Sequence, residues 1–335
     1  MTTPKSQGYA MPPEWAPHAR TWMMWPCREI VWDDMEATRR SYADVAHAIA
    51  RHEPLTMLVR AQDMAQARDL LGSDIELLES PIDDSWCRDA GPCFLRNAKG
   101  DKAGVNFRFN AWGGKYDPFD GDDAAARAIL TAAGVPIFDS PLIAEGGGVN
   151  VDERGTILTT ETCFPNANRN PDWSRDRIEA ELMEMLGGTK VIWLPGSDLE
   201  VETNGHVDGI AAFMAPGLVL MEGPTDEGNA WDQINADNIA AMQGQTDATG
   251  APITIRTVPP AVGDFPHPDM FCCSYVNSYL CNGAVIMPEY GVREDDIAAE
   301  LFQDFFPDRT IERVNIDAIA IGGGGIHCIT QQEPA

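Results

Sequence analysis

The chain has 335 residues, and its 24 Lys and Arg against 52 Asp and Glu give a formal net charge of −28. Such a charge excludes nucleic acids and anionic membranes as partners and favours a small cationic substrate. The 44% hydrophobic content excludes a disordered chain, because it suffices for a large buried core. The opening MTTPKSQGYAMPPEW has no basic start followed by an apolar run, and the eight cysteines lack zinc-binding spacing. We therefore expect a globular cytoplasmic protein.

Apolar residues that recur every three or four positions predict helices. The predicted ranges are 34–52, 61–72, 121–134, 174–187, 228–244 and 294–307. Acidic or hydroxyl groups at 121–123 and 174–176 are expected to begin two of these helices, and Gly134 and Gly187 to end them. Most helices are followed by a short apolar strand, at 75–78, 136–138, 191–194 and 253–258. Each strand precedes a Gly-rich or acidic motif and then another strand.

The reactive residues of these motifs recur at a nearly constant interval. Asp89 to Glu145 is 56 positions, Glu145 to His206 is 61, and His206 to Cys328 is 122, which is twice 61. A fixed period of this length is typical of repeated supersecondary units that bury their apolar faces against one another.

The doubled interval predicts a further unit with its motif near residue 267, and the segment 273–288 fits that place. We expect a single catalytic domain over 1–335, with about five units whose equivalent positions converge on a central axis. This predicts an α/β propeller, although periodicity alone also allows an open α/β sheet.

Acidic and aromatic residues cluster in the first motif, DDSWCRDAGP at 83–92. Asp83 and Asp89 could pair with a guanidinium group on which Trp86 stacks. A turn capped by Asp83 or Asp84, with Arg88 in a structural ion pair, is the alternative. Asp89 is the better functional candidate, because it lies on the repeat.

The other motifs supply a further carboxylate, a histidine with its own carboxylate, and a thiol. Glu145 precedes three glycines and could orient a histidine or bind a substrate nitrogen. In NGHVDG, His206 and Asp208 are two residues apart, so on a strand they would point to the same face. They could act as acid/base and substrate anchor, as metal ligands, or as a structural pair. Cys328 follows four glycines in GGGGIHCITQQ, where an accessible nucleophile and a buried structural thiol are both possible. Together these groups suit attack on a cationic carbon whose nitrogens are held in place.

The motifs, taken in order, resemble the agmatine deiminases, within the guanidino-modifying superfamily that also contains arginine deiminases, peptidylarginine deiminases and amidinotransferases. The resemblance runs nearly end to end, and it rests on MPPEWAPHARTWMMWP, DDSWCRDAGP, FNAWGG, EGGGVNVDERGTILTTETC, NANRNP, GHVDG and GGGGIHCITQQEP. It implies a pseudo-fivefold α/β propeller of ββαβ units. It also implies hydrolysis of agmatine to N-carbamoylputrescine and ammonia, in polyamine and putrescine biosynthesis, without a cofactor or metal.

The resemblance further implies catalytic roles. Cys328 resembles the nucleophile that forms a covalent amidino thioether. His206 resembles the acid/base that protonates departing ammonia and then activates water. Glu145 resembles the acid that supports His206.

For substrate binding, Asp89 and Asp208 resemble the carboxylates that hold the guanidinium group. Trp86 and Trp112 look like the walls of the pocket. Asp83, which the residues alone also nominate, is kept as a further substrate-binding candidate.

Departures from the family's pattern at Asn150, Asp152, Glu153 and Asn204 leave the distal specificity open. The alternatives are a deiminase or amidinotransferase for another small guanidino compound, a metal-dependent ureohydrolase that uses His206 and Asp208, and a non-catalytic binding protein. A homodimer is expected on general grounds.

Overall fold

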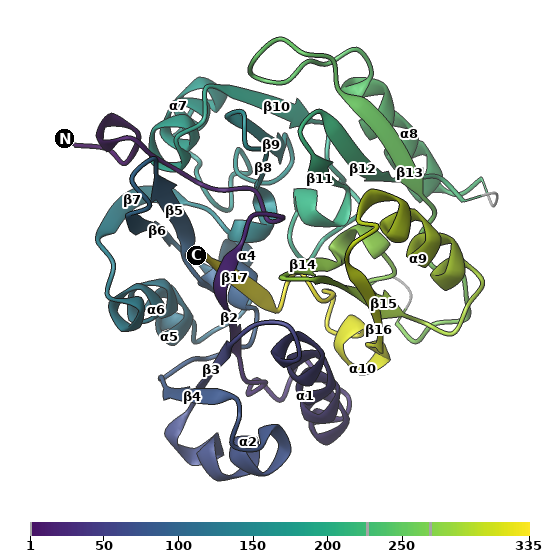
Figure 1. The fold of residues 1–335 in the computed structure, drawn as a ribbon. Coiled ribbons are helices and arrows are strands. Elements are labelled where there is room, and N and C mark those ends of the chain that lie inside the picture. The colour runs from purple at the N-terminus through teal and green to yellow at the C-terminus, as the bar shows by residue number, and fades with distance from the viewer. Residues whose placement is uncertain (1, 226–227, 268–269) are drawn as a thin grey trace.

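The computed structural model describes residues 2–225, 228–267 and 270–335, and these form five small β-sheets around a central axis (Figure 1). In hydrogen-bonded order, the first sheet contains β17 (Thr330–Pro334), β2 (His18–Met24), β3 (Leu55–Val59) and β4 (Glu76–Glu79). The second contains β1 (Tyr9–Ala10), β5 (Cys93–Asn97), β6 (Lys102–Arg108) and β7 (Ile137–Ile143). The third contains β10 (Lys190–Leu194), β9 (Thr156–Thr160) and β8 (Asn150–Val151). The fourth contains β11 (Ala211–Ala215), β12 (Leu218–Glu222) and β13 (Thr254–Val258). The fifth contains β14 (Tyr279–Cys281), β15 (Ala284–Glu289) and β16 (Thr310–Asn315).

The longer helices lie toward the rim of this ring (Figure 1). The α-helices are α1 (Met35–Ala50), α2 (Met64–Leu71), α3 (Cys87–Ala90), α4 (Ala111–Gly114), α5 (Asp120–Asp123), α6 (Ala125–Ala133), α7 (Arg175–Leu186), α8 (Ala230–Met242), α9 (Glu294–Phe305) and α10 (Asp317–Ala320). The 3-10 helices are η1 (Lys5–Gln7), η2 (Ala61–Asp63), η3 (Gly146–Gly148), η4 (Val207–Gly209) and η5 (Tyr275–Asn277).

Every sheet repeats one pattern. Two antiparallel strands are followed by a helix and then by a third strand that is parallel to the second. In the third sheet these elements are β8, β9, α7 and β10. The same ββαβ order recurs around the ring, so the predicted α/β propeller is confirmed, and the fifth unit begins with η5 and β14 rather than at residue 267 itself. The single-domain description stays a prediction.

Strands from the two ends of the chain belong to the same unit. Strand β17 pairs antiparallel with β2, with Thr330 opposite Met23 and Gln331 opposite Trp22. Figure 1 shows this pair, yellow beside purple, near the centre of the ring. Because Cys328 lies just before β17, the pairing places the C-terminal thiol at the axis.

The predicted helices are found, with one internal break. Ser174 accepts a hydrogen bond from the Arg177 N–H at the start of α7, and Gly187 follows with φ 75°. The range 121–134 was expected to be one helix, but it is divided into α5 and α6 at Ala124. The expected cap at its start was wrong as well, because Asp122 accepts the N–H groups of a distant turn instead.

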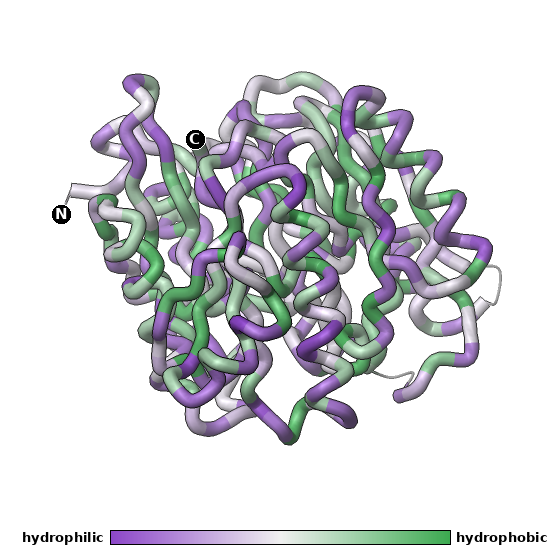
Figure 2. The backbone as a smooth tube through the Cα atoms, turned by 60° about the horizontal axis from the view of Figure 1, so that its bottom comes forward, coloured by the Kyte–Doolittle hydropathy of each residue, from purple (hydrophilic) through white to green (hydrophobic). Residues whose placement is uncertain are grey.

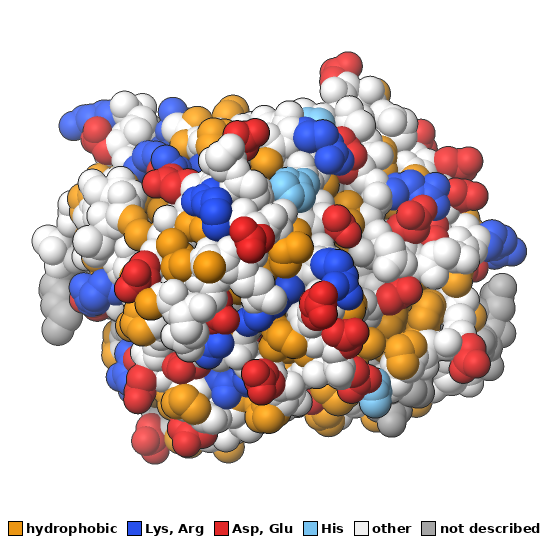
Figure 3. Space-filling view, turned by 90° about the horizontal axis from the view of Figure 1, so that it is seen from below, with side chains coloured by type: hydrophobic (Ala, Val, Ile, Leu, Met, Phe, Trp, Pro, Cys, Tyr) orange, Lys and Arg blue, Asp and Glu red, His pale blue; other side chains and the backbone are white. Residues whose placement is uncertain are grey.

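The outer helices are amphipathic, as the alternation of hydrophobic and hydrophilic residues in Figure 2 shows. In α9, for example, Ala298, Leu301 and Phe302 are buried at helical spacing, which covers the sheet beneath. Acidic, basic and hydrophobic side chains are intermixed on the face seen in Figure 3. Within 2–225, 228–267 and 270–335, there is no helix both long and apolar enough to span a membrane.

Candidate active site

Five loops that precede the first strand of each unit converge at the axis. They carry Asp89 on α3 before β5, Glu145 before β8, Asp208 in η4 before β11, Asn277 in η5 before β14, and Cys328 before β17. All five side chains are buried. The repeat therefore brings chemically different groups to equivalent positions around one point.

The Cys328 thiol lies in a polar and acidic setting. Asn277 Nδ2 donates to its Sγ over 3.2 Å, and Asp208 Oδ2 lies 3.6 Å from Sγ. Burial raises the pKa of the Cys328 thiol well above its usual value, and the charges of Asp208 and Asp89 raise it further. The free protein therefore holds a protonated thiol at neutral pH.

Asp89 is held in place by two donors. Trp112 Nε1 donates to Asp89 Oδ2 over 2.9 Å, and the Gly147 N–H donates to Oδ1 over 3.0 Å. His206 Nδ1 lies 3.7 Å from the same Oδ1. A Cβ atom on Gly147 would lie 2.6 Å from His206 Nδ1, so only glycine leaves room for this approach.

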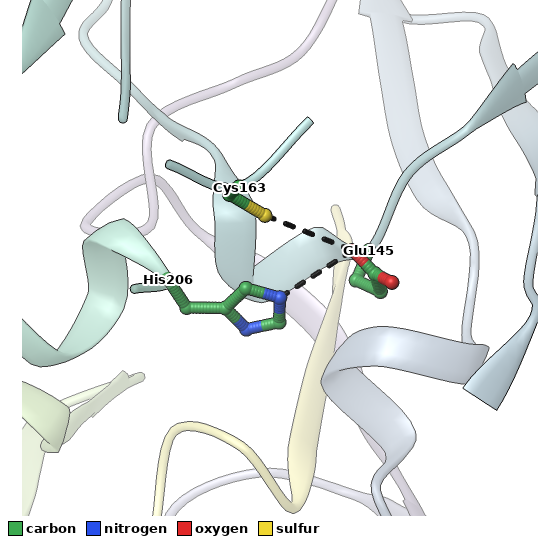
Figure 4. Close-up of side chains that lie close together, drawn as sticks. All are labelled: Glu145, Cys163 and His206. Carbon is green, nitrogen blue, oxygen red and sulfur yellow. Dashed lines mark hydrogen bonds and ion pairs between the residues drawn. The ribbon is translucent and has the colours of Figure 1, made fainter. Parts of the chain in front are cut away.

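Glu145 lies beside the second ring nitrogen of His206, Nε2 (Figure 4). Its Oε2 is 3.4 Å from His206 Nε2 and 3.9 Å from Cys163 Sγ, and Arg169 Nε donates to both carboxylate oxygens. Burial alone would raise the pKa of Glu145, but Arg169 and His206 lower it overall. Burial alone would lower the pKa of His206, but Asp89, Cys163 and Glu145 raise it well above its usual value, so the ring is an imidazolium.

Asp208 is held in place by a hydrogen bond with His327, whose Nδ1 lies 2.8 Å from Asp208 Oδ2. Burial alone would raise the pKa of Asp208, but the hydrogen bond and charge of His327 lower it overall. This carboxylate is therefore ionised and fixed in orientation.

A cavity of about 350 Å³ leads to these groups. Its lining residues are Val31, Trp86, Asp89, Trp112, Tyr116, Glu202, Thr203, Gly322, Gly323, Gly324 and Cys328. Of these, Trp86, Asp89, Trp112 and Cys328 are buried, whereas Tyr116 and Glu202 are half-buried. The cavity thus has a deep end, where the Asp89 carboxylate accompanies the Cys328 thiol, and an outer part with the Glu202 carboxylate.

The structure separates one sequence candidate from the rest. Asp83 does not line this cavity, because its Oδ2 accepts the N–H of Gly121 over 2.7 Å, in a structural turn. The strand expected for His206 and Asp208 was also wrong. Asp208 lies in the 3-10 helix η4, and the two side chains reach the axis from a turn that follows Gly205, at φ 79°.

Sequence reasoning missed several residues of the site. Asn277 lies in η5, ten residues after the predicted position 267, so the repeat could have nominated it. Glu14, Arg169 and Glu202 do not lie at the repeat positions, and only the folded chain brings them to the site. His327 could have been nominated, because it directly precedes Cys328 in the sequence.

Comparisons with known proteins identify the family of this chain. The family described as Porphyromonas-type peptidyl-arginine deiminase matches residues 10–334. A Streptomyces coelicolor protein named as a candidate agmatine deiminase is 41% identical over 335 residues, which cover 97% of this chain and 99% of that protein. A solved agmatine deiminase of Enterococcus faecalis is 35% identical with a TM-score of 0.96, and the match covers 100% of this chain and 98% of that one. By sequence and by structure, this chain belongs to the Porphyromonas-type peptidyl-arginine deiminase family.

Proposed function

We propose that this protein hydrolyses agmatine to N-carbamoylputrescine and ammonia through a covalent intermediate on Cys328. The observation that carries the proposal is the position of the Cys328 thiol, 3.6 Å from Asp208 at the deep end of a cavity that Asp89 also lines. The agmatine deiminases among the relatives support the choice of substrate.

Agmatine is a guanidinium group joined to an ammonium group by a short aliphatic chain. The guanidinium would lie between Asp89 and Asp208, with the aromatic faces of Trp86 and Trp112 beside it. The ammonium would reach Glu202, which lines the outer cavity and accepts a hydrogen bond from the Tyr116 hydroxyl over 2.8 Å. The carboxylate of arginine would be repelled there, so Glu202 favours a substrate with two positive charges.

The first half of the reaction replaces a C–N bond by a C–S bond. Binding of the guanidinium cation beside Cys328 offsets the negative charge of the carboxylates and lowers the thiol pKa. The thiol therefore releases its proton to solvent, and the thiolate attacks the guanidinium carbon. His206 then gives its Nδ1 proton to one amino group of the tetrahedral adduct. The C–N bond breaks, and ammonia leaves an amidino thioether.

The second half reverses these roles. His206 takes a proton from water, and the hydroxide attacks the amidino carbon. The C–S bond breaks and the thiolate returns. The remaining hydroxyl proton converts ammonia to ammonium, and the thiolate regains its proton from solvent after the product leaves. Nδ1 of His206 is a buried atom with no hydrogen-bond partner among the described residues, as this shuttle requires.

The test is ammonia release from agmatine, arginine and guanidinobutyrate, by wild type and Cys328→Ser, with and without EDTA. We expect turnover of agmatine that needs Cys328 and is unaffected by EDTA, and a mass increase on Cys328 in quenched samples. Activity abolished by EDTA but retained by Cys328→Ser would support the metal-dependent ureohydrolase instead. Release of ammonia from none of the three compounds by the folded protein would contradict the proposal.

A further inference from the structure

Three metal-ligating atoms meet at the Nε2 edge of the His206 ring (Figure 4), whereas Asp89 lies near Nδ1. They are Cys163 Sγ, Glu145 Oε2 and His206 Nε2, all within 4.8 Å of one another. All three residues are buried, and the proposed reaction does not use the Cys163 thiol. We propose that they form an inhibitory site for a soft divalent cation, Zn²⁺ or Cd²⁺, separate from the nucleophile Cys328.

The spacing suits such an ion. The carboxylate oxygen is 3.4 Å from the imidazole nitrogen and 3.9 Å from the sulfur, and the sulfur is at most 4.8 Å from the nitrogen. A point about 2.4 Å from all three atoms satisfies these separations, against usual Zn²⁺ bond lengths of about 2.0 to 2.3 Å. A small movement of the Cys163 sulfur toward the other two ligand atoms would therefore bring all three within bonding distance of the ion.

The donor set and the charge are also suitable. Thiolate and imidazole nitrogen are ligands that select zinc and its softer congeners over Mg²⁺ or Ca²⁺. The ion displaces one proton from the Cys163 thiol and one from the His206 imidazolium, so two positive charges enter and two leave. Arg169, which donates to Glu145, therefore faces the same net charge as it does beside imidazolium.

The acidic cavity ends beside this site, because Asp89 lines the cavity whereas His206, Glu145 and Cys163 lie behind it. Asp89 and Glu202 line the cavity, and Asp89 Oδ1 is 3.7 Å from His206 Nδ1 on the near side of the ring. The net charge of −28 raises the local concentration of divalent cations. The ion would pass the His206 ring to reach Cys163.

Inhibition follows from the loss of the proton shuttle, and this part rests on the proposed function. A metal ion on Nε2 leaves a neutral ring whose Nδ1–H is a poor acid and which cannot take up a second proton. Asp89 and Asp208 still bind the guanidinium group. The ion should therefore lower kcat and leave KM nearly unchanged.

Direct binding tests the site without reference to activity. Metal-free Cys328→Ser protein is titrated with Cd²⁺, and bound ion is followed by equilibrium dialysis and by the ultraviolet thiolate-to-cadmium charge-transfer band. We expect one site that disappears in Cys328→Ser/Cys163→Ser and persists in the control Cys328→Ser/Cys272→Ser. Equal Cd²⁺ binding by all three proteins, or none by the first, would overturn the proposal.

Inhibition of the otherwise unchanged enzyme is the second test. We expect Zn²⁺ to inhibit the wild type reversibly, through kcat, and Cys163→Ser and Cys163→Ala to need at least about tenfold more Zn²⁺ for the same effect. If both variants were as sensitive to Zn²⁺ as the wild type, the inhibitory role of this metal site would be refuted. Cd²⁺ bound through Cys163 by a protein that does not turn over agmatine would instead reject the proposed function and leave the metal site standing.

Discussion

His327 Nδ1 lies 2.8 Å from Asp208 Oδ2, and its Nε2 lies 2.8 Å from Glu14 Oε2. The imidazole thus lies between the buried carboxylate of Asp208 and the half-buried carboxylate of Glu14, and Arg88 donates to the same Glu14 oxygen over 3.3 Å. Burial and Arg88 lower the pKa of His327, but Glu14 and Asp208 outweigh them and raise it above its usual value. We expect His327 to act as a positioning residue that keeps Asp208 ionised.

Replacing His327 should therefore change the pH profile. Asp208 binds the guanidinium group only when ionised, so activity falls as the pH drops through its pKa. His327→Asn removes the charge that lowers this pKa, and the acid limb of kcat/KM should move to higher pH. At neutral pH we expect a loss of about 10- to 100-fold, the size of a charged hydrogen bond. The exposed His47→Asn is the control, and an unmoved acid limb in His327→Asn would contradict this role.

A methyl group at Gly147 should disrupt catalysis without unfolding the protein. Its Cβ would lie 2.6 Å from His206 Nδ1 and 2.7 Å from Asp89 Oδ1, so one of these groups must shift. A displacement near 1 Å costs about 100-fold in rate. Gly209→Ala is the matched control, since a Cβ there meets no atom of the described chain within 4 Å. Steady-state kinetics and circular dichroism of both variants would check this. Full activity of Gly147→Ala would show that catalysis does not need the close approach of His206 Nδ1 to Asp89 Oδ1.

Glu202 should select the second positive charge of the substrate. We expect Glu202→Gln to raise KM for agmatine by about two- to fivefold, the effect of one partly exposed ion pair, with a smaller change in kcat. Turnover of butylguanidine, which lacks the ammonium group, should be unaffected. The exposed Glu76→Gln serves as the control. A Glu202→Gln variant that still prefers agmatine over butylguanidine by the wild-type ratio would exclude this contact.

The Cys328 thiol should be neutral in the free enzyme, because burial raises its pKa well above the usual value. The ultraviolet thiolate absorbance of wild type minus that of Cys328→Ser, followed against pH, should rise only above pH 9, the usual value for the thiol. Adding guanidinium ion should move this rise to lower pH. A thiolate signal already complete at neutral pH without a cation would contradict activation by the substrate.

Glu53 should contribute to stability rather than to catalysis. His18 Nδ1 lies 3.2 Å from each Glu53 oxygen, and the Asn282 N–H donates to Oε2 over 2.6 Å. Burial alone would raise the pKa of Glu53, but His18 and Asn282 lower it overall, so its stabilisation is present above pH 4.5 and is lost as the pH falls through the lower folded-state pKa.

Glu53→Gln should accordingly reduce the free energy of unfolding by about 3 kcal/mol at neutral pH, as loss of one partner of a buried pair does. Chemical denaturation at neutral and acidic pH measures this. The difference from wild type should shrink at acidic pH. Glu76→Gln, whose partner Arg20 is also partly exposed, should change the free energy of unfolding by at most about 1 kcal/mol. A Glu53→Gln variant as stable as the wild type at neutral pH would contradict the assignment.

The sequence alone determined the repeat and most groups at the axis. Hydrophobic periodicity depends on local geometry, so the helices and the strands after them could be read directly, and the spacing of Asp89, Glu145, His206 and Cys328 followed from one unit length. The repeat favoured Asp89 over Asp83, but it did not exclude Asp83 from the site. They are chemically identical, and the deciding partner of Asp83 is the N–H of Gly121, on another loop.

Only the tertiary structure decided which remote groups complete the site. Glu14 and His327 are 313 residues apart, and they meet because β17 pairs with β2 and closes the ring. Cys163, which follows β9, lies beside Glu145 of its own unit and His206 of the next unit. Such contacts depend on how whole units pack around the axis, and no local pattern of residues encodes the distance between two side chains in different units.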